Sequence, residues 1–579
     1  MHKTFSRLLP VILSVLIIFT LVQSTPVQAE LPVYENQVLI VPYSNLDEIA
    51  YLGKRYDVVE VDSERQEAKI FSNQITRDAL AEAGFSWTID QEYTLKINTV
   101  EQASPWQISG IPSRPCFRTI SEVYASANSL VSSYPTLVEK IDIGDSWEKT
   151  QNPANGWDME VVLLTNRNNE ATEKSDVFIM SSIHAREWAT AELNLRLAEY
   201  LLQNYNVNPD VKWLLDYNRI HLVLVTNPDG RLQDEANTNW LWRKNTNTAY
   251  CPGQQTSQGY GPGADLNRNF PYHWSAPPTI GECDPTYFGA SAGSEPETQA
   301  ITTYVASIFP DQKGPNPNDK VDEETATGMF IDLHSYSRLV LWPWGYTTGK
   351  APNDESLKMM SYKFAYYNGH DPKQSSVLYP TDGSTDDFAY GELGVPGFCF
   401  EVGDEFHESC SKFENDINPR NIQALLRAVK IARLPYKLAY GPEVTALKVS
   451  TAANNNLIVT YTADDTLYSN YKGGVASQKI AAIRYSFDMP SWISGSNAKI
   501  IEITNGKPVY DAMLGVSAAG LAPGNHTLFF EAMDSDGNWG PPTAINLTIN
   551  ASITPTPIIP TPTPVPGLDL SIYLPLIER

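Results

Sequence analysis

Apolar runs alternate with amphipathic segments through the middle of the chain, and this alternation predicts its largest folded unit. Five nearly continuous apolar runs, typical of buried strands, lie at residues 160–164, 176–180, 219–225, 329–333 and 397–400. Apolar residues at helical spacing lie at residues 120–131, 191–202 and 417–432. Strands that are apolar on both faces are typical of parallel sheets covered by helices. We therefore expect an α/β domain over residues 112–438, with a mixed, mainly parallel, twisted sheet flanked by helices.

Different patterns on either side predict two further folded units. Residues 30–111 alternate short strands and helices and end in a linker with Pro and Gly, which predicts a small α+β module. Residues 441–550 contain strand-like runs separated by Gly, Asn, Asp and Ser, which predicts an all-β sandwich of the immunoglobulin or fibronectin kind. A Thr/Pro-rich stretch at 551–567 reads as a stiff linker. The apolar tail at 568–579 is either an attachment signal or a frayed end.

The first 29 residues have the character of a signal peptide. Basic residues precede an apolar run, and a small-residue cleavage motif follows it. The run is short for a membrane span, although a retained signal anchor is the alternative. We expect a secreted, extracellular protein without a transmembrane segment in the mature chain, attached to the cell surface if the C-terminal tail is a signal. Such a compartment permits disulfides.

Five cysteines leave one without an intramolecular partner. Cys251 and Cys283 lie in Gly/Pro-rich loop sequence that flanks one motif, so we expect them to form a bridge. Cys399 and Cys410 are the expected second pair, which leaves Cys116 without an assigned partner. The formal net charge of −25 argues against sequence-independent nucleic-acid binding, which needs a basic face.

A histidine and a glutamate lie three residues apart where a predicted strand meets a helix. These are His184 and Glu187, and such junctions are where ligands collect in open α/β sheets. His334 also ends an apolar strand, so parallel strands would bring it to the same sheet edge. Imidazole and carboxylate groups suit zinc. The spacing leaves open the alternative that His334 is a core histidine.

Hydrolysis at a zinc ion also needs a general base and a cationic partner. Glu401 ends a further apolar strand, where a carboxylate is costly to bury without a role or an ion-pair partner. Arg243 is one cationic candidate, and the neighbours Asn267 and Arg268 suit recognition of a carboxylate. Each of these features is common in ordinary loops when taken alone.

Five motifs in order resemble the zinc metallocarboxypeptidases of the pancreatic carboxypeptidase A/B type, which include bacterial carboxypeptidase T. They lie at residues 182–188, 241–244, 263–270, 331–337 and 398–401. The resemblance implies one Zn²⁺ held by His184, Glu187 and His334. It implies that Asp265 orients His184, that Glu401 activates the zinc-bound water, and that Arg243 stabilises the oxyanion.

The same resemblance implies how the substrate binds. The terminal carboxylate would contact Asn267, Arg268 and Tyr379, and sites further along the peptide would involve Arg186, Ser335 and Tyr336. Asp386 stands where B-type enzymes carry the aspartate that recognises terminal Arg or Lys. We expect a zinc-dependent exopeptidase that removes C-terminal Arg or Lys from peptides and proteins, and that also accepts apolar residues, as some bacterial relatives do.

The N-terminal module resembles the activation peptide of these proenzymes, so the chain's own N-terminal segment is the expected inhibitor of a monomeric enzyme. The alternatives are a zinc amidase or cell-wall peptidase on the same fold, and a surface binding protein whose sandwich carries the function. Residues 534–538 resemble a calcium loop, but such runs are more often hairpin turns, so Ca²⁺ has no further support.

Overall fold

The computed structural model describes residues 34–99, 109–169, 173–236, 241–252, 260–451 and 456–550. The predicted signal peptide, Thr/Pro-rich linker and apolar tail lie outside these segments. Within them, no helix combines the length and apolarity that a membrane span requires.

The N-terminal module is a four-stranded antiparallel sheet in the order β2-β3-β1-β4, with helices packed on it. Helix α1 is capped by Asn45, whose side chain accepts from the Glu48 backbone, and its last turn is basic, as the helix dipole favours. The elements are β1 (Gln37–Pro42), α1 (Leu46–Arg55), β2 (Val58–Asp62), β3 (Glu67–Ser72), α2 (Gln74–Glu82), β4 (Thr88–Ile89) and α3 (Gln91–Ile97).

The central domain is built on an eight-stranded mixed sheet in the order β11-β10-β12-β9-β7-β8-β6-β5. Strands β12, β9, β7 and β8 run parallel to one another, while β10, β6 and β5 pair antiparallel with their inner neighbours. This confirms the predicted mixed, mainly parallel α/β fold. The strands are β5 (Val138–Asp145), β6 (Asp158–Leu164), β7 (Ser175–Ser181), β8 (Asn218–Val223), β9 (Met329–His334), β10 (Leu339–Trp342), β11 (Asp371–Gln374) and β12 (Gly397–Glu401).

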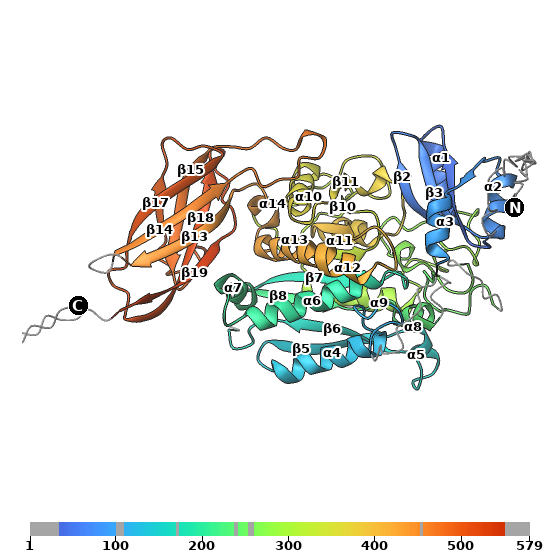
Figure 1. Ribbon diagram of the computed structural model, residues 1–579, viewed down its shortest axis with the longest axis horizontal. Helices are drawn as coiled ribbons and strands as arrows, with labels where there is room; N and C mark the ends of the chain where they lie inside the picture. Colours follow the sequence, from blue (N-terminus) through green and yellow to red (C-terminus); the bar gives the residue numbers. More distant parts are fainter. Residues whose placement is uncertain are drawn as a thin grey trace, which may run out of the picture. The chain divides into compact units, whose positions relative to one another are not determined.

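Helices cover this sheet, and α4, α6, α13 and α10 pack against one another in series as one layer (Figure 1). The longer helices are α4 (Ile120–Ser133), α6 (Trp188–Asn204), α7 (Pro209–Tyr217), α8 (Pro228–Ala236), α9 (Pro296–Ile308), α10 (Asp354–Asn368), α11 (Thr385–Leu393) and α13 (Asn418–Ile431). The short helical segments are α5 (Trp147–Gln151), η1 (Leu266–Arg268), η2 (Ser375–Val377), α12 (Cys410–Lys412), η3 (Phe413–Ile417) and α14 (Pro435–Leu438).

Three parallel strands end together at one edge of the central sheet. His334 and Glu401 are register partners at the ends of β9 and β12, and Ser181 at the end of β7 pairs with Leu333. His184 follows β7 by three residues. The predicted strand-end residues therefore meet at one edge, where the loops after the strands are free to build a site.

The C-terminal region consists of two antiparallel sheets, β13-β14-β17 and β16-β15-β18-β19. Alternate residues of β14, such as Leu457 and Val459, point into a shared apolar core with Phe530 of β18. The strands are β13 (Glu443–Thr451), β14 (Asn456–Asp464), β15 (Ile480–Phe487), β16 (Lys499–Glu502), β17 (Val509–Ser517), β18 (Gly524–Asp534) and β19 (Thr543–Ile549), with η5 (Tyr471–Gly473) between β14 and β15. The Asp534 carboxylate accepts from the Asp536 and Asn538 backbones, as in a hairpin turn.

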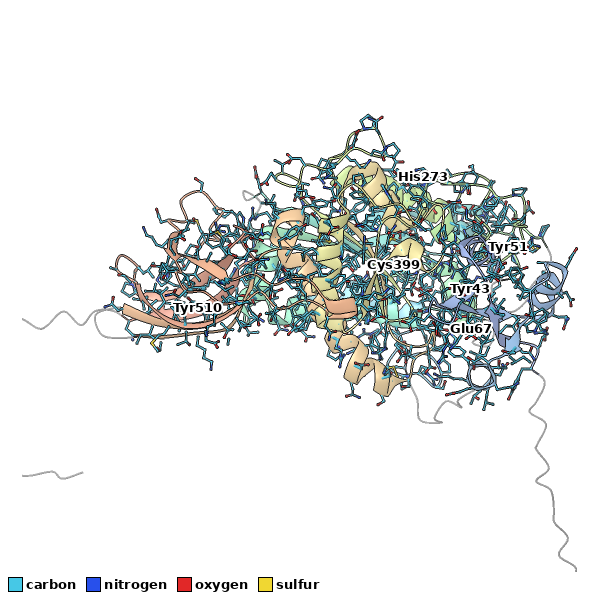
Figure 2. The ribbon with its side chains drawn as sticks, turned by 90° about the horizontal axis from the view of Figure 1, so that it is seen from above. Tyr43, Tyr51, Glu67, His273, Cys399 and Tyr510 are labelled. Atoms are coloured by element: carbon cyan, nitrogen blue, oxygen red, sulfur yellow. A yellow bond between two sulfur atoms is a disulfide. The ribbon has the colours of Figure 1, made fainter. Side chains whose placement is uncertain are left out.

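The disulfides confirm one predicted pair and correct the other. Cys251 and Cys283 are bridged as expected, but Cys410 pairs with Cys116, and the predicted Cys399–Cys410 bridge is wrong. Cys399, labelled in Figure 2, is buried and unpaired. It lies within β12, two residues before Glu401 and on the same face, so its thiol is beside the Glu401 carboxylate instead of the loop that carries Cys410.

Candidate zinc and peptide site

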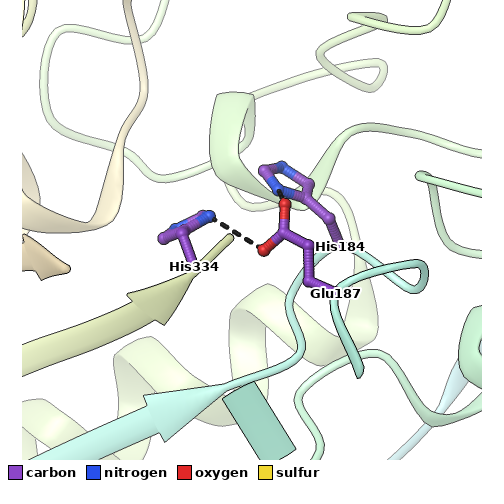
Figure 3. Close-up of side chains that lie close together, drawn as sticks. All are labelled: His184, Glu187 and His334. Carbon is purple, nitrogen blue, oxygen red and sulfur yellow. Dashed lines mark hydrogen bonds and ion pairs between the residues drawn. The ribbon is translucent and has the colours of Figure 1, made fainter. Parts of the chain in front are cut away.

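The three predicted metal ligands meet in one buried cluster at the sheet edge (Figure 3). Glu187 bridges the two imidazoles, with Oε1 2.7 Å from His184 Nδ1 and Oε2 3.3 Å from His334 Nδ1. All three side chains are buried, and their candidate ligand atoms lie within 4.8 Å of one another. Two nitrogens and a carboxylate that converge in this way fit a zinc ion.

Each imidazole is held by a second carboxylate through its remaining nitrogen. His184 Nε2 lies 3.1 Å from Asp265 Oδ1, as the resemblance predicts, and His334 Nε2 lies 2.8 Å from Asp332 Oδ2. These contacts direct both Nδ1 atoms towards Glu187. A carboxylate behind a metal-binding histidine fixes the ring orientation and makes the ring a stronger ligand.

Asp332 is a site residue that the sequence analysis missed. It is fully buried and also accepts from Thr385 Oγ1 at 2.8 Å, while its Oδ1 atom has no hydrogen-bond partner among the residues that the structure describes. Burying a carboxylate with one oxygen atom unpaired is costly, which indicates that its contact with His334 has a role at the site. The signal was available, because an acid two residues before a strand-end histidine lies on the same face of that strand.

Glu401 and Arg243 lie beside the metal ligands. Burial raises the pKa of Glu401 to about 8, with Glu187 acting in the same direction and His334 and Arg243 opposing it. A dication at the ligand cluster favours the charged carboxylate and so lowers this pKa again. The Arg243 guanidinium is fixed by Asp265 Oδ2, at 3.0 Å from Nε and 2.9 Å from Nη2.

Asn267 and Arg268 lie on the short helix η1 next to the metal ligands. Asn267 Nδ2 is 3.3 Å from His334 Nε2, and its Oδ1 accepts from the Thr385 backbone. Arg268 donates to the Asn267 carbonyl oxygen, and its nearest carboxylate oxygen in an ion pair is 4.0 Å away, on Asp265. The Arg268 fork is therefore available to a further anion.

Asp386 faces the same cleft from the first turn of α11. Its two oxygens accept from Ser384 Oγ at 2.6 Å and Ser375 Oγ at 2.5 Å. The side chain is buried, and no lysine or arginine of the described segments forms an ion pair with it. The same cleft is also lined by Leu341, Leu378, Thr381 and Cys399.

The N-terminal module forms one wall of this cleft through residues 57–61. Asp57 makes a bidentate ion pair with Arg186. The rings of Tyr93 and Tyr336 stack with their centroids 5.9 Å apart. The Ser335 backbone N–H donates to Glu187 Oε2 at 3.2 Å. The predicted peptide-binding side chains Arg186 and Tyr336 are thus covered by the chain's own N-terminal segment.

Tyr379 also contacts the module. Its ring packs against Gly53 of α1 so closely that a Cβ atom at that position would lie 2.1 Å from the ring. The structure therefore brings the predicted site residues to one cleft, with Arg186, Tyr336 and Tyr379 engaged by the module. The exception is Asp265, which is buried behind His184 and does not line the cleft.

Comparison of the chain with known proteins agrees with this geometry. A family model described as zinc carboxypeptidase matches residues 123–424, so the chain belongs to the zinc carboxypeptidase family. Carboxypeptidase A1 of Mus musculus is 30% identical over 299 residues, which is 50% of this chain and 62% of that protein. Mast cell carboxypeptidase A of Homo sapiens is 30% identical over 338 residues, covering 56% of this chain and 72% of that protein.

Solved structures share the fold. Carboxypeptidase A from Helicoverpa armigera superposes with a TM-score of 0.54 at 20% identity, over 69% of this chain and 97% of that one. Thrombin activatable fibrinolysis inhibitor superposes with a TM-score of 0.51 at 21% identity, over 69% of this chain and 99% of that one. The metal that the family name implies is the one that the donor cluster fits.

The carboxylate behind His334 gives the first prediction. Asp332→Asn should speed the loss of zinc to an excess of chelator by about 10- to 100-fold, because a neutral amide no longer polarises the imidazole. The rate is followed with a chromogenic zinc indicator.

The matched control is Asp176→Asn. Asp176 is a buried carboxylate 2.9 Å from His221 Nε2, in a pair of the same kind outside the site. Its variant should release zinc at the wild-type rate. Equal rates for Asp332→Asn and the wild type would contradict a role for Asp332 at the metal.

Proposed function

We propose that this chain is a zinc-dependent exopeptidase that hydrolyses the C-terminal peptide bond of peptides and proteins. The observation that carries the proposal is that one cleft contains the three-ligand cluster, the Glu401 carboxylate and the Asn267–Arg268 pair. The first two suit hydrolysis, and the third suits a free carboxylate at the end of a chain.

The side chains divide the work of the reaction. Asn267 and Arg268 hold the terminal carboxylate, and Arg243 donates to the scissile carbonyl oxygen as negative charge develops there. His184, Glu187 and His334 would hold Zn²⁺, which would supply a Lewis acid for that carbonyl and for the attacking water. Glu401 accepts a proton from the attacking water and then delivers it to the nitrogen of the breaking C–N bond, so the products are a shortened peptide and a free amino acid.

An amidase or a cell-wall peptidase on the same fold is the rival function. It does not need the free carboxylate that Asn267 and Arg268 are suited to bind, so the two functions differ in the substrate end they require.

The test compares two versions of one peptide. Protein freed of its N-terminal module should release Arg from a peptide ending in Arg, lose this activity to a chelator, and regain it with Zn²⁺. The same peptide with a C-terminal amide should be cleaved at least about 100-fold more slowly, because the interaction with Arg268 is lost. Product masses report both rates. Equal cleavage of the two peptides would favour the amidase.

Asp386 is the proposed specificity residue for terminal Arg and Lys. This proposal is supported by the burial of the Asp386 carboxylate without a cationic partner in the described residues, and by two serine hydroxyls that keep the carboxylate oriented. A cationic side chain in the cleft would complete this ion pair. The apolar wall, Leu341 and Leu378, suits the methylene stem of such a side chain and also suits apolar residues.

Asp386→Asn should lower kcat/KM for peptides ending in Arg by about 100-fold, since it removes one partner of a buried pair. It should leave peptides ending in Phe within a few-fold of the wild-type value, which controls for folding and zinc content. The ratio of the two rates is the measurement, and an unchanged ratio would exclude this role.

We also propose that the N-terminal module inhibits the enzyme until it is removed. Asp57 is 3% exposed and is held by Arg186; burial alone would raise its pKa, but Arg186, Arg243 and His184 keep it below the usual range. A further ion pair, Lys54–Asp382 at 3.1 Å, joins the module to the loop before α11. A peptide in the cleft would have to displace these contacts.

Asp57→Asn should therefore raise the activity of the uncleaved protein. Losing one partner of a buried ion pair costs about 3 kcal/mol, which weakens docking of the module by roughly 100-fold. The control is Asp62→Asn, because Asp62 is a more exposed acid of the same module whose ion pair is with Arg65 of that module. Activity that stays the same in both variants would argue against inhibition through Asp57.

Secretion remains part of the proposal. Two disulfides are consistent with an oxidising compartment, where such bonds persist. Attachment to the cell surface through residues 568–579 is proposed only as the consequence of their acting as a signal.

A further inference from the structure

We propose that the cleft selects substrates with an acidic side chain just upstream of the scissile bond, and that Arg186 makes this selection. The inference rests on the proposed carboxypeptidase activity and on removal of the N-terminal module. It adds a second recognition element to the terminal residue that Asp386 is proposed to read.

The ion pair between Asp57 and Arg186 shows what this position binds. Nη1 of Arg186 lies 2.5 Å from Asp57 Oδ2, and Nη2 lies 2.8 Å from Oδ1, so both oxygens are matched by both terminal nitrogens. Arg186 is fully buried and Asp57 nearly so. A parallel pair of charge-assisted bonds is specific for a planar carboxylate.

Among the described residues, the rest of the Arg186 environment supplies no second carboxylate as a partner. The guanidinium lies 4.0 Å from the Phe406 ring centre and 5.6 Å from that of Phe71. Within the described segments, its remaining polar contact is a long one, 3.5 Å to the Leu241 carbonyl oxygen, and its Nε atom has no hydrogen-bond partner there. Within the part of the chain that is described, Asp57 is the one carboxylate paired with Arg186.

Release of the module affects Arg186 differently from the other two arginines of the cleft. Arg243 keeps Asp265 at 2.9 Å, and Arg268 has the substrate's terminal carboxylate as its proposed partner. Arg186 loses Asp57, so its guanidinium lies against the ring of Phe406 with its two terminal nitrogens unpaired. A cation on an apolar surface is stabilised when a substrate carboxylate takes the vacated place.

The position of Arg186 indicates which substrate residue it reads. It directly precedes the metal ligand Glu187 in the chain, and Asp57 Oδ1 lies 3.8 Å from Arg243 Nη1, close to the proposed scissile carbonyl. An extended peptide advances about 3.3 Å per residue. The acidic residue is therefore the second or third residue from the substrate's C-terminus.

The test uses blocked peptides that end in Arg and carry Asp or the isosteric Asn at the second, third or fifth position from that end. With the module removed, kcat/KM should be about tenfold higher for Asp than for Asn at the second or third position. It should be equal for the two at the fifth. High salt should reduce the Asp preference, because the ion pair becomes solvent-accessible in the bound peptide.

Arg186→Gln should bring the Asp/Asn ratio to one, whereas Arg219→Gln, which alters a surface arginine paired with Asp176, should leave it unchanged. Because the ratio is internal to each preparation, a partly folded variant still gives a valid result. A ratio of one in the wild type, or a preference that survives in Arg186→Gln, overturns the inference. Failure to cleave any of the peptides would instead contradict the proposed function.

Discussion

The site depends on one constraint of the fold, which is that β7, β9 and β12 run parallel and stop at the same edge of a buried sheet. The register that pairs His334 with Glu401 fixes the distance between a metal ligand and the proposed base, and the turn after β7 brings His184 and Glu187 to them. These strands are almost wholly buried on both faces, so a slip in register would misplace every side chain in a closely packed core. Packing of the core therefore holds the geometry of the site.

Buried charge is the second feature that unites the structure. The carboxylates of Asp265 and Asp332 contact the two histidines, and Asp265 also fixes Arg243. A further carboxylate, that of Asp386, accepts from serine hydroxyls in the cleft. A buried carboxylate is costly unless it has a partner. In this site the partner is a cationic or hydroxyl group of the protein, or a cationic group of the substrate. The N-terminal module satisfies a buried cation in the same way, because Asp57 supplies the carboxylate that Arg186 otherwise lacks.

The sequence predicted which candidate site residues at the ends of strands would come together. His184, Glu187, His334 and Glu401 each follow an apolar run, and parallel pairing brings such positions together. Asp332 was missed because it lies inside a run read as apolar. The predicted pairing of Cys399 with Cys410 was wrong, because the true partner of Cys410 is Cys116, which lies 294 residues away in the chain and is brought to it only by the fold.

The central claim is that Glu401 acts as a proton carrier beside a zinc ion that it does not hold. Its most direct test is Glu401→Gln in protein freed of the module, with zinc content and release of terminal Arg measured on the same sample. The account predicts one zinc per chain, as in the wild type, and a kcat lower by at least about 100-fold. A variant that keeps its zinc and hydrolyses at the wild-type rate would contradict it.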